Sequence, residues 1–402
     1  MSNIRTIDEL DVAGKRVLVR GDVNVPMRGD VITDITRLDR TIPTLVELAD
    51  RGAMVIVLSH MGRPKGRVVP ELSLRPLAEK IGEKIGKPVP FAADCIGDPA
   101  KIVVGDMRSG DIVLLENLRF HNGETDNDAD FSKALAELGD VYVSDAFSCA
   151  HRSHASIVSV AKLLPTAAGR LMQAELNALR DALEKPNRPV AALVGGAKIS
   201  TKMGVLDFLA RKVDILIIGG GMANTFLAAK GVNVGKSLCE HDMLAAAKVI
   251  MEKAEAACCE VVLPVDAVVA AEFKEGVVPE TVSLDAVSSD RMILDCGPAS
   301  IEAVNNRLGA CGTLVWNGPM GAFEVSPFDK GTNAVARRAA ALTKSAGLLS
   351  VAGGGDTVAA LDHAGVKEAF SYVSTGGGAF LEWLEGKTLP GVAVLLKEPT
   401  GP

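Results

Sequence analysis

Positively charged side chains follow several apolar runs in the first part of the chain. The segment VIVLSHMGRPKG, at 55–66, begins like a buried strand and continues into His60 and Arg63. Arg119 follows another such run in LLENLRFH, and Arg152 lies in SCAHRSH after a third. In a parallel sheet, ligands bind outside the carboxyl ends of the strands, so these side chains are expected to share one edge.

Two further arginines belong to the same pattern, because Arg20 ends its own apolar run and Arg37 lies shortly beyond it. Arginine forms bidentate bonds to phosphate and carboxylate groups alike. A single arginine is more often part of a surface salt bridge. Several arginines at one edge, however, repel one another unless an anion lies among them. The set therefore favours a site for a small ligand with several negative charges.

The second half of the chain ends its strands differently. No Gly-Gly pair occurs before residue 190, whereas GGA, GGG, GGG and GGG follow at 195–197, 219–221, 353–355 and 376–378. GGGDTVAAL and TGGGAFLEWL each lead from a strand through glycines into a helix. Backbone amides at a helix N-terminus bind phosphate, and glycine allows close approach. This half therefore predicts a nucleotide site.

Charged residues near these glycines fit the same prediction. Asp356 lies where a carboxylate could hold Mg²⁺ beside phosphates, although a helix N-cap is the alternative. Lys198 and Lys202 lie four residues apart in GGAKISTK and are predicted to share one helical face. Two like charges there favour an anion between them, and a solvated face is the alternative.

The alternation of short apolar runs with amphipathic segments predicts the strands and helices that position these residues. Strands apolar on both faces, separated by helices, predict parallel sheets covered by helices. With 402 residues the chain is too long for one core, so two domains are expected. The segment 170–189 has leucines at helical spacing and ends in Pro186 and Pro189. We predict an α/β protein of two Rossmann-like domains joined by this helix, which is either a simple linker or a hinge.

Composition excludes several classes of protein. The net charge of −7 argues against a nucleic-acid partner. The seven cysteines include no CxxC pair, which favours a reducing cytosol over a disulfide framework. No apolar run reaches membrane-spanning length and the first residues do not resemble a signal peptide, so we expect a cytoplasmic protein.

Two nucleotide motifs are absent. GVNVGKS, at 231–237, has three residues between its glycines where a P-loop needs four, and no GxGxxG follows a strand. Phosphoryl transfer between a nucleotide and a small anion is the favoured activity. A Rossmann oxidoreductase and a two-domain solute-binding protein that closes on an anion are the alternatives.

Eleven segments, taken in order over residues 15 to about 390, resemble the phosphoglycerate kinase family: RGDVNVP, SHMGRP, LLENLRFH, DAFSCAHRSHAS, GGAKISTK, GGGMANTF, LPVD, DCGP, WNGPMGAFE, GGGDT and STGGGAF. The resemblance implies reversible, Mg²⁺-dependent phosphoryl transfer from 1,3-bisphosphoglycerate to ADP, giving 3-phosphoglycerate and ATP. It also implies a monomer with hinge-type domain closure, no nucleic-acid partner and no membrane partner.

The resemblance also assigns roles to residues by position. It implies a triose site formed by Asp22, Asn24, Arg37, His60, Arg63, Arg119 and Arg152. It implies a nucleotide site formed by Lys198, Lys202, Gly220, Leu294, Glu324, Gly354, Gly355, Asp356 and Thr357. Within that site, Glu324 would contact the ribose, Gly220 and Leu294 the adenine, and Asp356 the metal.

Catalytic roles are expected for Arg37 and Lys202, assisted by Lys198, with the amides from Gly376 and Gly377 onward stabilising the transferring group. The expected domains are a triose domain at 1–170, a hinge helix at 171–186 and a nucleotide domain at 187–384. The segment 385–402 is expected to pack back on the first domain.

The chain departs from the family pattern at two places near the triose site. Gly21 and Val23 stand where a small aliphatic and then Phe or Leu are usual, and Ser148–Cys149 replaces Gly-Thr. Neither change removes a charged contact, so we expect modest effects on stability and little effect on chemistry.

Overall fold

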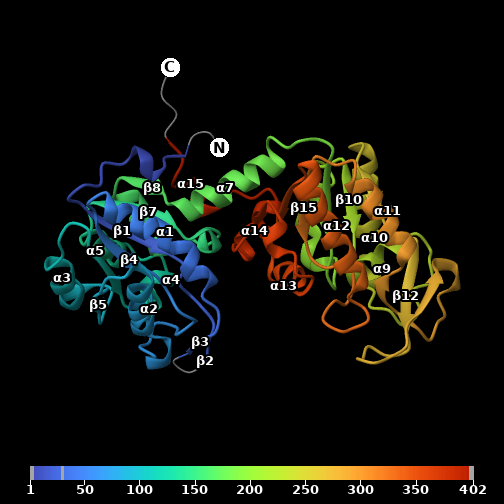
Figure 1. Ribbon diagram of the computed structural model, residues 1–402, viewed down its shortest axis with the longest axis horizontal. Coiled ribbons are helices and arrows are strands. Elements are labelled where there is room, and N and C mark those ends of the chain that lie inside the picture. The colour runs from blue at the N-terminus through green and yellow to red at the C-terminus, as the bar shows by residue number, and fades with distance from the viewer. Residues whose placement is uncertain (1–3, 29–30, 398–402) are drawn as a thin grey trace, which may run out of the picture. The chain divides into compact units, whose positions relative to one another are not determined.

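The computed structural model describes residues 4–28 and 31–397 (Figure 1). The chain forms two compact units. Unit 1 contains Met1–Leu176 and Thr388–Pro402, and unit 2 contains Asn177–Lys387. The boundary lies inside helix α7 (Arg170–Leu183), which begins in the first unit and ends three residues before Pro186.

Unit 1 is built on a six-stranded sheet in the order β5-β6-β4-β1-β7-β8. Every pairing in this sheet is parallel. The strands are β1 Arg16–Gly21, β4 Met54–Leu58, β5 Phe91–Ala92, β6 Ile112–Leu115, β7 Val141–Asp145 and β8 Thr166–Ala168. A two-stranded antiparallel ribbon, β2 Met27–Arg28 and β3 Val31–Ile32, follows β1.

Both faces of this sheet are buried, because successive side chains of a strand point to opposite sides. Val17 and Val19 belong to one core cluster, while Leu18 between them belongs to another. The helices of the unit are α1 Thr36–Asp50, α2 Arg75–Ile85, α3 Gly97–Gly105, α4 Asn122–Thr125, α5 Ala129–Ala136, α6 Val160–Leu163 and α15 Pro390–Ala393.

The end of the chain lies in unit 1 as far as it is described. Leu396 forms an antiparallel bridge with Ile4. Gly391 donates its amide to the carbonyl of Ala150 over 2.8 Å. Lys397 forms an ion pair of 2.7 Å with Glu9. The rest of the expected returning segment, 398–402, lies outside the described residues.

Unit 2 has its own six-stranded parallel sheet, in the order β11-β10-β9-β15-β16-β17. Its strands are β9 Val190–Val194, β10 Ile215–Ile218, β11 Glu260–Val262, β15 Thr313–Asn317, β16 Leu349–Ala352 and β17 Tyr372–Val373. Its helices are α8 Met203–Leu209, α9 Gly220–Ala229, α10 Leu244–Ala256, α11 Pro298–Leu308, α12 Lys330–Ala346, α13 Gly355–His363 and α14 Gly378–Leu384. The predicted α/β class, with two parallel sheets flanked by helices, is confirmed.

Unit 2 also contains an antiparallel sheet that the sequence pattern did not predict. Its strands are β12 Asp266–Ala270, β13 Glu280–Ser283 and β14 Met292–Cys296, in the order β13-β12-β14. Three of the four residues of β13 are exposed, so that strand has no apolar run. Among the described residues, no helix has the length and apolar character needed to span a membrane.

Candidate functional sites

The carboxyl ends of four neighbouring strands in unit 1, β6, β4, β1 and β7, carry the predicted cations. Arg119 lies in a 3-10 turn, Leu118–Phe120, after β6, and His60 and Arg63 follow β4. Arg37 lies in the first turn of α1, beyond β1, and Arg152 follows the 3-10 turn Phe147–Cys149 after β7. We call this set of five residues the basic edge.

Direct contacts link Arg37 to the residues that follow β1. Its Nη1 lies 3.2 Å from the Asp22 carboxylate and donates to the carbonyl of Asn24 over 3.0 Å. Asp22 also accepts a hydrogen bond from the hydroxyl of Ser148. The Ser148 departure from the family pattern therefore adds a contact to a predicted site residue.

A second set of contacts runs through Gly62, directly after His60 and Met61. The Asn24 side chain accepts a hydrogen bond from the Gly62 amide over 3.1 Å, and Arg119 donates to the Gly62 carbonyl over 2.7 Å. The Nε atom of Arg119 is buried without a hydrogen-bond partner. Arg63 is exposed and forms no ion pair or hydrogen bond within 4–28 and 31–397. Both arginines thus retain donors for an incoming anion.

His60 is 4% exposed and is surrounded by cations. Burial lowers its pKa well below the usual value, and the charges of Arg20, Arg119 and Arg152 lower it further. A neutral imidazole therefore lies beside several guanidinium groups. Such an edge attracts small anions and offers hydrogen-bond donors to their oxygens.

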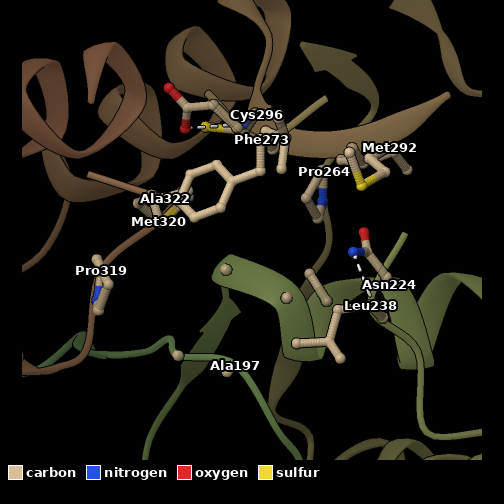
Figure 2. A pocket seen from close by; sticks show the side chains of 18 of the residues that line it. Ala197, Asn224, Leu238, Pro264, Phe273, Met292, Cys296, Pro319, Met320 and Ala322 are labelled. Carbon is tan, nitrogen blue, oxygen red and sulfur yellow. Dashed lines mark hydrogen bonds between the residues drawn. The ribbon is translucent and has the colours of Figure 1, made fainter. Parts of the chain in front are cut away.

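Unit 2 contains a pocket of about 360 Å³ where the ends of β9, β10 and β15 face the antiparallel sheet. Figure 2 shows the Phe273 ring projecting into it beside Met320 and Ala322. The lining also includes the predicted residues Gly220, Leu294, Glu324 and Asp356. The walls are mostly apolar with a few polar groups, as in sites for flat aromatic ligands such as a nucleobase.

Gly220, at the start of α9, serves this pocket by having no side chain. Its amide is already bonded to the carbonyl of Met320 over 2.7 Å, so it offers no free donor. Its φ is +67°, and a Cβ atom would lie 2.7 Å from backbone atoms of Gly196. Only glycine fits this position without rearrangement.

The start of α13 offers free donors instead. The amides of Gly355 and Asp356 have no hydrogen-bond partner within the described residues. The N-cap is Gly354, so the alternative role of Asp356 as N-cap does not hold. Thr357 is 1% exposed and its hydroxyl accepts from the Gly318 amide over 2.7 Å, so its side chain braces the loop after β15.

Asp356 is exposed on the pocket wall, and its carboxylate forms no ion pair or hydrogen bond within the described residues. Magnesium in nucleotide sites is usually bound by one or two carboxylates together with the phosphates. A single free carboxylate beside free helix amides therefore fits Mg²⁺.

The two lysines do not share a helical face, which corrects the sequence-based expectation. Lys198 is exposed in the loop before the 3-10 turn Ser200–Lys202, because the glycine loop after β9 continues past it. Lys202 is partly buried and donates to the carbonyls of Gly195 over 2.6 Å and Asn317 over 3.1 Å. Burial lowers its pKa to about 8, and the nearby Asp356 acts in the opposite direction.

The glycines before α14 also differ in what they offer. The Gly376 amide is bonded to the hydroxyl of Ser374 over 3.0 Å. The amides of Gly377 and Gly378 have no partner within the described residues, and Gly377 has a φ of +48°. Only the later glycines of this run therefore retain free donors.

Several residues of the two sites carried no signal in the sequence. Phe273 and Leu238 line the pocket from segments without any motif, and Asn317 holds Lys202 through its backbone. Only Asn317 could have been found, because WNGP follows a strand as the other site segments do.

Comparisons with known proteins show the family to which the chain belongs. A family model described as phosphoglycerate kinase matches residues 7–387. The chain belongs to the phosphoglycerate kinase family. A phosphoglycerate kinase of Ruegeria sp. (strain TM1040) is 59% identical over 391 residues, covering 97% of this chain and 99% of the relative.

Solved structures of the phosphoglycerate kinase family show the same fold. The phosphoglycerate kinase from Coxiella burnetii has a TM-score of 0.91 at 43% identity, with 98% of each chain covered. That from Pyrococcus horikoshii OT3 has a TM-score of 0.82 at 29% identity, again with 98% of each chain covered.

Proposed function

We propose that this chain transfers a phosphoryl group reversibly between 1,3-bisphosphoglycerate and ADP, giving 3-phosphoglycerate and ATP. As a member of its family it is a kinase whose acceptor is a carboxyl group. The family match over residues 7–387 is the observation that carries the proposal. It accounts for both a basic edge and a glycine-lined pocket in one chain.

The basic edge of unit 1, with Asp22 and Asn24, is proposed to bind the triose. 3-Phosphoglycerate carries a phosphate and a carboxylate, which match several arginines with unused donors. Arg119 supplies a buried Nε without a partner, and Arg63 supplies an exposed guanidinium. Asp22 and Asn24 hold Arg37 and are suited to orient it and to bind the hydroxyl group of the triose.

The pocket of unit 2 is proposed to bind the nucleotide. Gly220 and Leu294 would contact the adenine, and Glu324 would contact the ribose. The free amides of Gly355 and Asp356 are suited to phosphate oxygens. Thr357 supports this loop from beneath through its bond to Gly318.

The Asp356 carboxylate is proposed to hold Mg²⁺ together with the nucleotide phosphates. When bound, this ion neutralises phosphate charge. Asp356 keeps its oxygens free of other partners within the described residues and keeps a negative charge near Lys202.

Phosphoryl transfer needs positioning and charge neutralisation more than covalent catalysis. We propose that Arg37 and Lys202 donate to oxygens of the transferring group, with Lys198 assisting. The amides of Gly377 and Gly378 would stabilise its equatorial oxygens, and Gly376 would support them through Ser374. No general base is needed, because the acceptor is already a carboxylate or a diphosphate oxygen.

The two substrates are proposed to bind to different units, so the units must come together during transfer and exclude water. Small-angle scattering should show a smaller radius of gyration with 3-phosphoglycerate and MgATP present together than with either alone. An unchanged radius would contradict domain closure.

We also propose that the enzyme works as a monomer in the cytoplasm. All seven cysteines are free thiols, which supports a reducing compartment. Sedimentation at increasing protein concentration would reveal any larger assembly.

A coupled assay tests the activity directly. 3-Phosphoglycerate and MgATP are supplied with glyceraldehyde-3-phosphate dehydrogenase and NADH, and NADH oxidation is followed. We expect NADH oxidation only when this chain, 3-phosphoglycerate and MgATP are all present. Its absence would remove the proposed reaction and favour a binding protein without chemistry.

A further inference from the structure

Arg20 is a fully buried cation at the end of β1, with an exposed fraction of 0%. Burying a charge is costly unless the group is paired or fully hydrogen-bonded. Yet no carboxylate forms an ion pair with Arg20 within 4–28 and 31–397. A buried, unpaired guanidinium beside the basic edge requires an explanation.

The guanidinium is held by neutral groups. Its Nε donates to the hydroxyl of Ser156 over 2.8 Å, and Nη1 donates to the carbonyl of Gly21. Ser156 in turn donates its hydroxyl to the buried Glu124 over 2.8 Å. Ser156 therefore links Arg20 to the Glu124 carboxylate, and this chain of hydrogen bonds fixes the orientation of the guanidinium.

The remaining nitrogen of the guanidinium, Nη2, lies 3.0 Å from Nδ1 of His60. A guanidinium has five N–H donors and no acceptor, so Nδ1 must be the acceptor of this bond. An accepting Nδ1 carries no proton. In a neutral imidazole the proton is then on Nε2, and no residue within 4–28 and 31–397 bonds to that atom.

Charges on every side of His60 act on its protonation. Arg20 on β1, Arg119 after β6, and Arg152 and His154 after β7 all oppose a positive imidazole. Asp22 and Cys149 also lie near His60, because a carboxylate oxygen of Asp22, the sulfur of Cys149 and a ring nitrogen of His60 are all within 4.8 Å of one another. The negative charge of the Asp22 carboxylate favours a proton on His60. Asp22 is engaged by Arg37 and Ser148, so the cations dominate.

We infer that Arg20 is a positioning residue that holds His60 as the neutral tautomer with its proton on Nε2, so that Nε2–H donates to an oxygen of the anionic substrate. The identity of that substrate rests on the proposed function. The tautomer itself does not, because it follows from the hydrogen bond in the free protein. His60 then contributes a directed donor that stays neutral over the pH range of the test below.

The wild-type protein tests the tautomer without any substitution. Long-range ¹H–¹⁵N correlations on ¹⁵N-histidine-labelled protein are recorded from pH 5.5 to 8.0, and His60→Gln assigns the resonance. The expected result is a protonated Nε2 and a bare Nδ1 at every pH. A protonated Nδ1, or an imidazolium at pH 6 to 8, would overturn the inference.

Arg20→Met tests whether the arginine is the cause. The variant is expected to show a tautomer mixture, and KM for 3-phosphoglycerate should rise about tenfold, the scale for one hydrogen bond to a charged group. The kcat value and KM for ATP should stay near wild type. Arg16→Met is the matched control, because Arg16 lies on the same strand and pairs with Asp140 at the surface.

A double-mutant cycle separates positioning from a general loss of charge. If Arg20 acts through His60, Arg20→Met should raise KM little further when His60 is already alanine. Equal tenfold effects in both backgrounds would overturn the inference. If Arg20→Met does not fold, the wild-type tautomer measurement still decides the inference, because Arg20→Lys keeps a group that only donates and cannot serve as the test.

An inactive wild-type enzyme with the expected His60 spectrum would contradict the proposed function alone. An active enzyme with the other tautomer would contradict the role of Arg20 alone. The two failures are therefore distinguishable.

Discussion

The two units carry groups suited to anions at the ends of similar sheets, but these groups differ in their chemistry. Unit 1 uses side chains, with Arg37, His60 and Arg119 as examples, and these are held by hydrogen bonds to neighbouring carbonyls or guanidinium groups. Unit 2 offers free backbone amides, as at Gly355, and glycines such as Gly220 at positions where a side chain would not fit. Charged side chains suit a small ligand with much charge, whereas glycine backbone suits a larger ligand that needs close approach.

The largest effect is expected for Arg37→Ala. Turnover should fall by roughly 10²- to 10³-fold, the scale for losing one donor to a transition state. Nucleotide affinity should stay nearly unchanged, because Arg37 belongs to unit 1. The measurement is the coupled assay with calorimetric nucleotide binding, and exposed Arg108→Ala is the control. Wild-type turnover in Arg37→Ala would remove this residue from the mechanism.

Gly220→Ala tests the backbone chemistry of unit 2. The positive φ strains alanine by about 1–3 kcal/mol, and the new Cβ meets Gly196 backbone that cannot move easily. Nucleotide affinity should fall by about tenfold or more, while binding of 3-phosphoglycerate is kept.

The matched control is Gly231→Ala, which also has a positive φ but has nothing within 4 Å of the added Cβ. Both tryptophans, Trp316 and Trp383, belong to unit 2, so tryptophan fluorescence during urea denaturation reports that unit. Equal loss of nucleotide affinity in the two variants would show that strain, and not the pocket surface, is the cause.

Asp356→Ala is expected to weaken binding of Mg-nucleotide by about tenfold and to spare 3-phosphoglycerate, because one charged metal ligand is worth a few kcal/mol at most in an open site. Calorimetry with and without Mg²⁺ gives the measurement. Asp362→Ala, in the same helix and paired with Lys367, is the control. Equal loss of both ligands would indicate misfolding.

The smallest effect concerns the pH dependence of Lys202. Its pKa of about 8 in the folded protein lies below the ordinary lysine value of 10.5. Nucleotide affinity of the wild type should therefore decline by a few-fold as pH rises from 7.5 to 9, because the ammonium is lost. The free energy of unfolding changes in the opposite sense. Burial of the charged lysine destabilises the fold fully below pH 8, and this destabilisation disappears as pH rises from 8 to 10.5.

Calorimetry at pH 7.0 to 9.5 measures the affinity, and Lys202→Met should bind weakly with no change over this range. A flat wild-type profile would show that the ammonium does not contact the nucleotide. It would also leave unit 2 with backbone donors alone, which would sharpen its contrast with unit 1.

The strands that run through both cores were predictable because residues such as Val17, Leu18 and Val19 are buried on alternate faces and form an apolar run. Strands β5 and β8 have only two and three residues, too few to form such a run. The antiparallel sheet was missed because β13 is largely exposed and is defined by its pairing, not by its composition.

Site residues were predictable where nearby sequence determines their position, and not where tertiary contacts do. Strand-end arginines and glycines are visible in the sequence, but Arg20 and Arg63 look alike there, although one is buried and the other exposed. The prediction that Lys198 and Lys202 share a helical face was wrong, because it depends on the residue at which the preceding loop ends and the helix begins. Phe273 reaches the pocket only through tertiary contacts.

The return of residues 388–397 to unit 1 has a consequence for protein synthesis. Unit 2 is one continuous segment, Asn177–Lys387, whereas unit 1 needs both ends of the chain. On the ribosome, the bridge between Ile4 and Leu396 cannot form until residue 396 has emerged. The first-made unit must therefore wait for its last strand contact, and the later-made unit can complete its structure before it.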